Sequence, residues 1–318
     1  MLPAEAVERF RADCHALGDW GPPVHVAVSG GADSLALLLL AHAAFPGQVH
    51  AATVDHGLRP ESALEAVRVA DVCAALGVPH ATLAPSWDEA PQANVQAEAR
   101  AARYEALRRW AALNGRRWLA TAHHRDDQAE TLLMRLARGA GVAGLAGVRP
   151  ANAMDLLGGG LTLLRPLLGW RKAELAALVA STPFAPVDDP SNDDPRYDRT
   201  LARRLLAETP WLEPERLAAS AAHLADCEAA LAWAAEQAHV SYHAGGIAEA
   251  DAAALPLELQ RRILVRVLGA LTDGAPLPGP KVMRLLAALD AGRSGMLADV
   301  IVHPGPPWRF EPAPPRKS

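Results

Sequence analysis

Half of the 318 residues are hydrophobic and the formal net charge is −5, so the chain suits about two domains with large apolar cores and lacks an overall basic character. Any nucleic-acid contact would need a local basic surface. The longest apolar run, 35–44, is far shorter than the ~20 residues of a membrane-spanning helix. Because the first fifteen residues also lack an apolar signal core, we expect a soluble cytoplasmic protein. The three cysteines are isolated, which excludes a C-x-x-C metal or dithiol site.

Apolar, β-branched segments alternate with segments of helical length through the first half of the chain. We expect strands at 24–28, 48–54, 80–83, 118–122 and 161–164. We expect helices at 4–17, 33–44, 61–76, 94–114, 126–138 and 170–181. The alternation predicts an α/β fold with a doubly wound parallel sheet. Such sheets bind ligands beyond the carboxyl ends of their strands.

The composition changes after Thr209 and Pro210, where alanine-rich segments with acidic spacers begin. We therefore predict an α/β domain at 1–208 and a second, smaller, mainly helical domain at 209–318. Its helices are expected within 211–239, 255–271 and 281–289, and a terminal hairpin within 295–310. The tail at 311–318, with three prolines and two basic residues, is expected to be disordered.

Six small or polar residues join the first predicted strand to a leucine-rich helix: Ser29, Gly30, Gly31, Ala32, Asp33 and Ser34. The two glycines let the backbone approach a ligand closely, and the free amide groups of the helix N-terminus favour an anion. The hydroxyls of Ser29 and Ser34 add donors. Asp33 would repel a phosphate unless a cation, which we expect to be Mg²⁺, lies between them. The alternative is an ordinary glycine turn before a helix capped by Asp or Ser.

A second polar segment follows the fourth predicted strand and contains two histidines and three acidic residues: His123, His124, Asp126, Asp127 and Glu130. It is either a helix cap, with Asp126 as N-cap and Glu130 in the first turn, or a metal site that includes His123 and Asp127. Carboxylates outnumber histidines and H-E-x-x-H is absent, which favours Mg²⁺ over zinc. Asp33 and Asp127 could hold one ion between them.

The predicted helix at 94–114 carries several arginines with aromatic residues between them. Three of its residues fall on roughly one face: Arg100, Arg103 and Tyr104. This face could contact phosphates or a base. The alternative is a solvated helix face, stabilised by pairs such as Glu105 with Arg109.

The segment 187–204 places five aspartates and two prolines before a basic helix. One interpretation is a solvated acidic turn followed by a basic helix. The other is a structured loop from which an arginine reaches the α-phosphate of a nucleotide and stabilises developing charge. The residues alone favour neither.

Taken together, these segments resemble the tRNA(Ile)-lysidine synthases, a family within the N-type ATP pyrophosphatases. The string S-G-G-x-D-S at 29–34 is the pyrophosphate loop (PP-loop) of that larger group. Further motifs follow in the family's order and spacing across about 20–205: VDHGLR at 54–59, AR with RY at 99–104, AHH with DDQAET at 122–131, RPLL at 165–168, and DPSN with YDR at 189–199. The resemblance implies that ATP, with Mg²⁺, adenylates the wobble cytidine of a minor isoleucine tRNA with a CAU anticodon. The ε-amine of lysine then displaces AMP and gives lysidine.

The resemblance also implies roles for single residues. Asp33 and Asp127 correspond to the catalytic aspartates, which we expect to bind the Mg²⁺. His123 is implied to lie near the nucleotide and Arg199 near its phosphates. We expect His56, which follows the second strand at the same sheet edge, to bind ATP together with the PP-loop. The expected tRNA-binding residues are Arg100, Arg103 and Tyr104. The sequence singles out no residue of the lysine pocket, and it leaves a homodimer as one option for the oligomeric state.

Two features depart from the family pattern. Thr200 stands where the family usually has asparagine, and threonine can still donate a hydrogen bond. The chain also resembles the compact form of the family, with a single small helical domain. The alternative function is a PP-loop enzyme of tRNA sulfur transfer, but such enzymes usually need paired cysteines. A nucleotide-binding regulatory protein is a second alternative, although binding alone would not need carboxylates beside phosphates.

Overall fold

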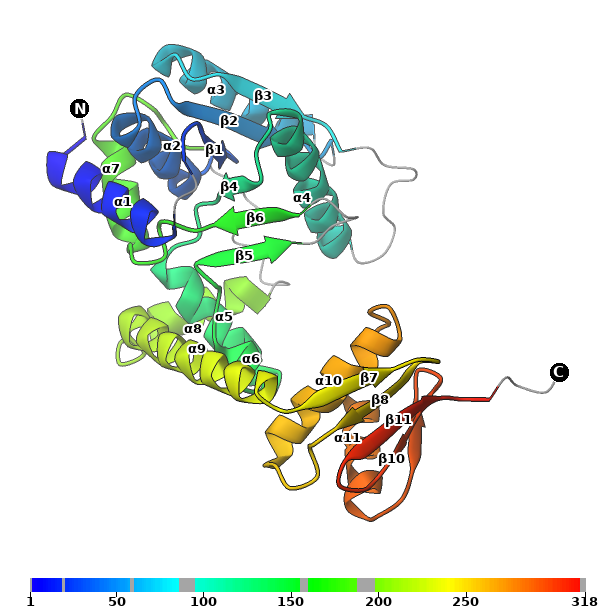
Figure 1. Ribbon diagram of the computed structural model, residues 1–318. Helices are drawn as coiled ribbons and strands as arrows, with labels where there is room; N and C mark the ends of the chain where they lie inside the picture. The colour runs from blue at the N-terminus through cyan, green and yellow to red at the C-terminus, as the bar shows by residue number, and fades with distance from the viewer. Residues whose placement is uncertain are drawn as a thin grey trace. The chain divides into compact units, whose positions relative to one another are not determined.

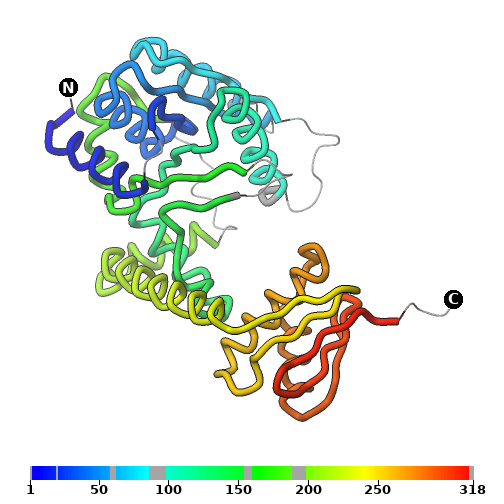
Figure 2. Tube along the Cα trace, viewed as in Figure 1, coloured from blue at the N-terminus to red at the C-terminus, as the bar shows by residue number. Residues whose placement is uncertain are grey.

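The computed structural model describes residues 2–18, 21–57, 60–85, 95–154, 160–187 and 198–314. The motif residues at 58–59 and 189–197 therefore lie outside the described residues. The chain divides into two compact units, Met1–Leu224 and Ala225–Ser318. Figure 2 follows the Cα trace of the first unit from blue to yellow-green and that of the second from yellow to red. The division lies within helix α9 (Pro214–Glu236), beyond the boundary that the sequence predicts near residue 208.

The first unit contains the predicted doubly wound sheet (Figure 1). Its strands are β1 (Val24–Ala27), β2 (Val49–Val54), β3 (His80–Leu83), β4 (Trp118–Ala120), β5 (Ala151–Met154) and β6 (Leu161–Leu164). The order is β3-β2-β1-β4-β6-β5, and neighbours are parallel except for β5, which pairs antiparallel with β6. The sequence analysis missed β5, because its residues Ala-Asn-Ala-Met have weak strand propensity.

Helices cover both faces of this sheet and bury opposite side chains of each strand. They are α1 (Ala4–Ala16), α2 (Ala32–Ala44), α3 (Pro60–Leu76), α4 (Val95–Leu113) and α7 (Lys172–Ala180). Val26, Ala120 and Leu164 pack with α1, α2, α3 and α7, whereas Leu119 and Leu163 pack with α4 on the other face. Leucines 35, 37, 38 and 40 of α2 are all buried, so this helix is apolar all round instead of amphipathic.

The strand order places a topological switch between β1 and β4. From β1 the chain continues to β2 and β3 on one side, whereas β4 and β6 lie on the other. Registers such as Val26 with Ala120, and Ala120 with Leu164, align the carboxyl ends of the central strands. Loops that follow these strands therefore meet at one edge, beside the crevice where α/β sheets bind ligands.

Two further helices lie beside this edge. They are α5 (Arg125–Ala137), which follows β4, and α8 (Asp198–Glu208). A short helix, α6 (Val142–Leu145), follows α5 within the glycine-rich segment. No helix in the described ranges combines the length and apolarity that a membrane span requires.

The second unit contains the two predicted helices, α10 (Leu257–Leu271) and α11 (Gly279–Asp290), together with a five-stranded antiparallel sheet. The strands are β7 (Val240–His243), β8 (Ile247–Ala250), β9 (Gly295–Leu297), β10 (Val300–His303) and β11 (Trp308–Pro312). They run in the order β7-β8-β11-β10-β9. Only β9 to β11 match the predicted terminal hairpin. The strands β7 and β8 were missed because each has only four residues and β8 is half alanine; the loop between them includes Gly245 and Gly246, both with positive φ.

Candidate active site

The PP-loop joins β1 to α2 and leaves the start of that helix open. The N-cap is Gly31, and no side chain of the described residues caps the helix there, so the first amide groups of α2 have no intrahelical partner. Gly30 has φ +92°, and a Cβ at this position would lie 3.0 Å from Val187 Cγ2 and 3.2 Å from Val69 Cγ2. The loop therefore needs glycine here for both its conformation and its packing. The alternative of a helix capped by Asp33 or Ser34 does not describe this structure.

Ser34 organises the loop from within. Its hydroxyl accepts hydrogen bonds from the amides of Ser29 and Gly30, both at 3.1 Å, and donates to the Gly31 carbonyl at 2.9 Å. The sequence analysis expected this hydroxyl to serve as a donor to phosphate. The structure instead uses its proton inside the loop, and the hydroxyl of Ser29, an exposed residue, donates to Ser34 Oγ at 3.2 Å.

Asp33 and Asp127 meet around the ring of His124. The His124 Nε2 atom lies 3.4 Å from Asp33 Oδ2 and 3.6 Å from Asp127 Oδ2, and the ring is almost fully buried. Burial alone would lower the pKa of His124, but the hydrogen bond to Asp33 and the charges of the neighbouring aspartates outweigh it and raise this pKa. Two loops that follow different strands thus bring both predicted aspartates to the mouth of the PP-loop.

The start of α5 explains how this arrangement forms. His124 is the N-cap, its ring accepts from the Asp127 amide at 3.4 Å, and Asp127 Oδ2 accepts from the His124 amide at 3.0 Å. The sequence analysis placed Asp126 at the cap, which is wrong. Asp126 Oδ2 instead accepts from the Lys172 amide at the start of α7. A capping box therefore fixes Asp127, so its helix-capping and site roles are compatible.

The donor set fits a magnesium ion. Asp33 Oδ1 is buried and has no hydrogen-bond partner among the described residues, which is costly for a carboxylate oxygen unless a cation approaches it. Within the same ranges, no three His, Cys, Asp or Glu side chains form a ready-made metal cluster. Mg²⁺ is typically held by one or two carboxylates together with substrate phosphates and water. Asp33 and Asp127 provide that number.

His123 lies beside this pair but makes a different contact. Its Nδ1 atom is 3.0 Å from Thr121 Oγ1. Burial lowers the pKa of His123 to about 4, and the positive charges of Arg165, Arg100 and Arg199 act in the same direction against Asp127. The ring is therefore neutral near pH 7. The charge of Asp127 acts on His123, but it is the ring of His124 that contacts both aspartates, so the alternative of His123 and Asp127 as metal ligands stays a prediction.

Arg199 is tied to α5 by an ion pair. Its Nε atom lies 3.1 Å from Glu130 Oε2, and Arg203 Nε donates to Glu130 Oε1 at 2.7 Å. Glu130 is 2% exposed, and such a buried carboxylate is strongly destabilising if its partners are removed. The pair fixes α8 against α5 and keeps Arg199 close enough to Asp127 to lower the pKa of that carboxyl.

The expected tRNA-binding residues lie on the first half of α4. Arg103 Nε donates to His56 Nε2 at 3.0 Å. This hydrogen bond links an expected tRNA-binding residue to an expected ATP-binding residue. Arg100 is exposed, with its guanidinium 5.0 Å from the centre of the Tyr104 ring. Tyr104 is only 7% exposed and packs against the sheet. Its burial leaves little ring surface for a base, so the expectation of tRNA contact now rests on the two arginines.

Comparison with known proteins identifies the family. Residues 12–209 match the PP-loop domain family. The chain is 46% identical over 295 residues to a tRNA(Ile)-lysidine synthase of Zymomonas mobilis subsp. mobilis, which covers 92% of this chain and 89% of that protein. It is 48% identical over 317 residues to one of Novosphingobium aromaticivorans, with 98% and 95% covered. The chain belongs to the tRNA(Ile)-lysidine synthases.

A solved structure supports the fold of this lysidine synthase family member. The U34-tRNA thiolase NcsA from Methanococcus maripaludis, solved with its [4Fe-4S] cluster, superposes with a TM-score of 0.55 and 17% identity. The match covers 70% of this chain and 79% of the thiolase. At this identity the likeness concerns the fold alone, whereas the family assignment rests on the lysidine synthases.

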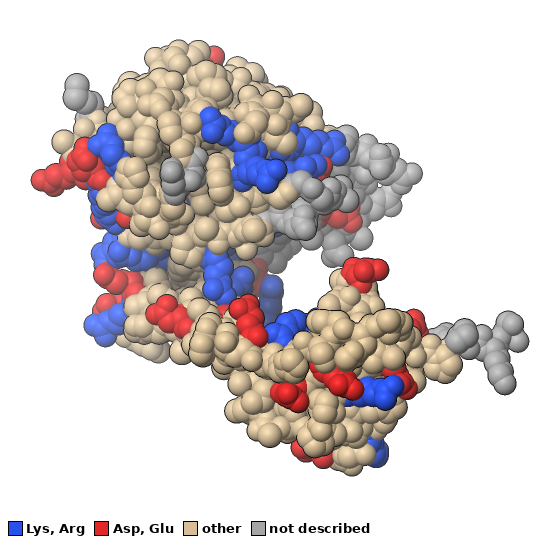
Figure 3. All heavy atoms as spheres, in the orientation of Figure 1, with Lys and Arg blue, Asp and Glu red and all other residues tan. Residues whose placement is uncertain are grey.

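Basic side chains gather on the first unit of this lysidine synthase family member. In the face drawn in Figure 3, Lys and Arg side chains form several separate patches on that unit. A chain with an acidic net charge can bind nucleic acid only through local basic patches, and this unit carries such patches.

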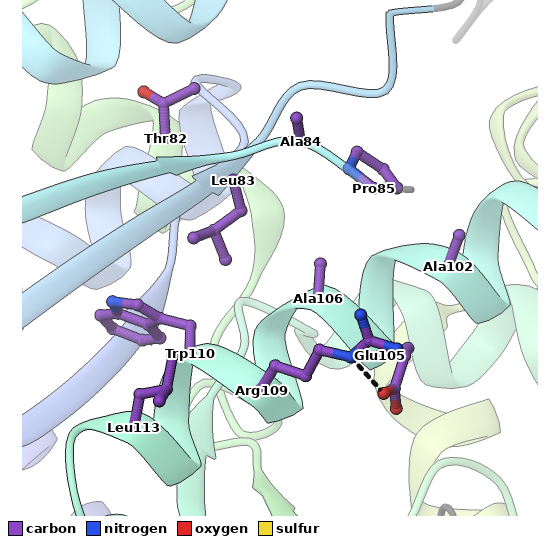
Figure 4. Close-up of a pocket in the computed structure, with 10 residues that line it drawn as sticks. All are labelled: Thr82, Leu83, Ala84, Pro85, Ala102, Glu105, Ala106, Arg109, Trp110 and Leu113. Carbon is purple, nitrogen blue, oxygen red and sulfur yellow. Dashed lines mark hydrogen bonds and ion pairs between the residues drawn. The ribbon is translucent and has the colours of Figure 1, made fainter. Parts of the chain in front are cut away.

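A pocket of about 660 Å³ lies away from the PP-loop, between β3 and α4 (Figure 4). Apolar side chains such as Leu83 and Trp110 line it, and its charged groups, Glu105 and Arg109, pair with each other at 2.7 Å. Among the described residues its lining offers the Thr82 hydroxyl but no cysteine, histidine, lysine or unpaired carboxylate.

Proposed function

We propose that this protein makes lysidine in two steps at the crevice between β1 and β4. In the first step the cytosine carbonyl oxygen of the wobble nucleotide attacks the α-phosphorus of ATP and pyrophosphate leaves. In the second step the ε-amine of lysine attacks the adenylated carbon, AMP leaves with the oxygen, and the amine loses a proton. The tRNA carries a CAU anticodon, as the family resemblance implies.

One observation carries this proposal: Asp33 and Asp127 approach the same His124 nitrogen at the open start of α2. A site that binds only a phosphate gains nothing from two carboxylates beside it, because they repel the anion. A site that cleaves ATP does gain, since carboxylates can hold the metal that accompanies the phosphates. Mg²⁺, when bound by Asp33 and Asp127, would neutralise charge on the phosphates and make pyrophosphate a better leaving group.

The other residues of the crevice have separate tasks in the proposal. The amide groups at the start of α2 hold the pyrophosphate oxygens, with the helix dipole behind them. Arg199, held in place by Glu130, stabilises negative charge on the α-phosphate as it develops. His123 is neutral near pH 7, so it serves as a hydrogen-bonding group beside the nucleotide. His56 lies on the β2 side, where it binds ATP.

The tRNA is proposed to approach over the first half of α4. Arg100 and Arg103 are exposed there, and their guanidinium groups can bind phosphate oxygens. Arg103 also contacts His56. The tRNA-binding and ATP-binding residues would therefore be in direct contact through Arg103 and His56.

The two half-reactions can be separated by an exchange assay. With ATP, Mg²⁺ and tRNA(Ile) of CAU anticodon but no lysine, the enzyme should incorporate labelled pyrophosphate into ATP, because the adenylated tRNA can return to ATP. Without tRNA the exchange should fall to background. Exchange that needs no tRNA, or that a tRNA of another anticodon supports equally, would contradict the proposal.

A further inference from the structure

One buried arginine of the site has no carboxylate to balance its charge. Arg165 follows β6 and is 6% exposed. Its Nη1 donates to the Arg149 carbonyl at 2.5 Å, but its Nε is buried and has no hydrogen-bond partner within the described part of the chain. In the same ranges no acidic side chain forms an ion pair with it, in contrast to Arg199 and Arg203, which share Glu130.

A buried, charged donor without a partner destabilises the folded protein unless a ligand binds it. An unpartnered buried donor loses its hydration without compensation, and a buried charge loses more. Desolvation lowers the pKa of Arg165, Tyr104 opposes this shift in part, and the positive charge of Arg100 adds to it. An anionic ligand would remove both penalties. The Nε edge of a guanidinium is suited to a two-point contact with a carboxylate.

The position of Arg165 points to the second substrate and not to ATP. The PP-loop and His56 follow β1 and β2, on one side of the switch point. Arg165 lies on the other side, beside Thr121, whose amide donates to the Leu164 carbonyl at 2.9 Å. Arg165 is thus next to His123, one strand beyond β4 from the PP-loop, at the border between the nucleotide and the second substrate.

Two anions are candidates for the partner of Arg165, a tRNA phosphate and the carboxylate of lysine, and the burial of Arg165 distinguishes between them. A tRNA phosphate belongs to a large polymer and is met by exposed side chains such as Arg100 and Arg103. Arg165 is 6% exposed, which leaves too little surface for the phosphate of a polymer and favours a small carboxylate. The free amino acid supplies one, and its four methylene groups leave the ε-amine free to extend toward the reacting base.

We propose that Arg165 binds the α-carboxylate of lysine at the carboxyl end of β6. This inference rests on the proposed function, since it assigns the binding mode of the amine that the second step consumes. Arg165 thereby makes the enzyme select an amino acid over a simple diamine, and it positions the substrate without taking part in adenylation.

The test compares lysine with cadaverine, which is lysine without the carboxylate. Wild-type enzyme should prefer the substrate lysine in kcat/KM. The Arg165→Lys variant should reduce that preference by at least about tenfold, because the new side chain keeps the positive charge but loses the planar guanidinium edge. The loss should appear mainly as a raised KM for lysine, with the KM for cadaverine little changed. Arg165→Gln should show the same pattern.

The matched control is Arg135→Lys. Arg135 is also partly buried and donates its Nη1 to two backbone carbonyls, those of Gly144 and Gly147. It has no expected contact with either substrate, so the lysine preference should stay within about threefold of wild type.

Three results would overturn the inference. The first is an unchanged lysine preference in both Arg165 variants. The second is weaker tRNA binding with a smaller salt dependence and unchanged lysine KM, which would assign Arg165 to a phosphate. The third is loss of tRNA adenylation without lysine in both variants, which would make Arg165 a support of the sheet edge. Failure of the proposed function itself differs from all three, because wild-type enzyme would then form no product with either amine.

Discussion

Asp33 combines a buried, unpartnered Oδ1 with an Oδ2 that faces the His124 ring. Asp33→Asn keeps the shape but removes the charge that would hold Mg²⁺. We expect adenylation to fall by at least about a hundredfold, by analogy with the loss of one transition-state contact. The measurement is pyrophosphate release at increasing Mg²⁺ concentration. The control is Asp126→Asn, whose side chain caps α7 through Lys172 and whose activity should stay near wild type. Normal turnover and Mg²⁺ dependence in Asp33→Asn would remove the metal role.

His25 offers a separate test at the opposite end of β1. It is 2% exposed and packs 4.7 Å from the Trp110 ring. Burial lowers its pKa to about 4 from 6.5. The unfolded chain therefore binds a proton below pH 6.5 that the folded chain refuses until about pH 4, so stability should fall as the pH drops through this window. A shift of this size corresponds to about 3 kcal/mol.

The measurement is the free energy of unfolding in urea at pH values between 4 and 7. Wild type should lose more stability across this range than His25→Phe, which fills a similar space and cannot take up a proton. Carboxylates titrate in both proteins, so the difference between the two curves isolates His25. Parallel curves would show that His25 is protonated in the folded state without cost.

At the scale of elements, the PP-loop depends on the backbone of Gly30. Alanine at positive φ costs about 1–2 kcal/mol, and here its Cβ would also press on Val187 and Val69. Gly30→Ala should therefore weaken ATP binding at least about tenfold, because the loop must move. Gly47→Ala is the matched control, since Gly47 has φ +69° and nothing within 4 Å of an added Cβ. Equal ATP affinity in both variants, measured by calorimetry, would contradict this account of the loop.

The elements that the sequence could predict are those with strong local signals. The strands β1 to β4 and β6 stand out because apolar, β-branched residues alternate with helical segments, and the PP-loop because its glycines end a strand. The strands β5 and β8 are half alanine and lack this signal, and β7 is only four residues long; they pair because a neighbouring strand offers a partner. Strand propensity depends on context in this way.

The candidate site likewise contains residues that local sequence patterns predict and contacts that depend on tertiary structure. Asp33 and Asp127 could be predicted, because both follow strands whose carboxyl ends share an edge. His124 could not be distinguished from His123, since only the ring orientation decides which of them faces the aspartates. The Glu130 pair with Arg203 joins residues 73 positions apart, a contact that no local pattern contains. The orphaned Nε of Arg165 likewise follows from tertiary burial.

For the whole molecule, the acidic net charge makes tRNA binding depend on local groups. Arg100→Ala and Arg103→Ala should each weaken tRNA binding and reduce the slope of log affinity against log salt by about one unit. Arg108 lies on the same helix but pairs with both oxygens of Glu105 at 2.8 Å, so Arg108→Ala should leave the slope unchanged. Filter binding at several salt concentrations checks this. Equal slopes in all variants would assign the α4 arginines to the helix surface alone.

The most direct test of the central claim is the mass of the wobble nucleotide. Wild-type enzyme is incubated with ATP, Mg²⁺, lysine and a tRNA(Ile) of CAU anticodon, and the digested tRNA is examined by mass spectrometry. The account predicts that the wobble cytidine gains the mass of lysine minus water, with AMP and pyrophosphate released, and that it gains nothing when ATP or lysine is omitted. A sulfur-for-oxygen mass change, or no change with any isoleucine tRNA, would contradict it.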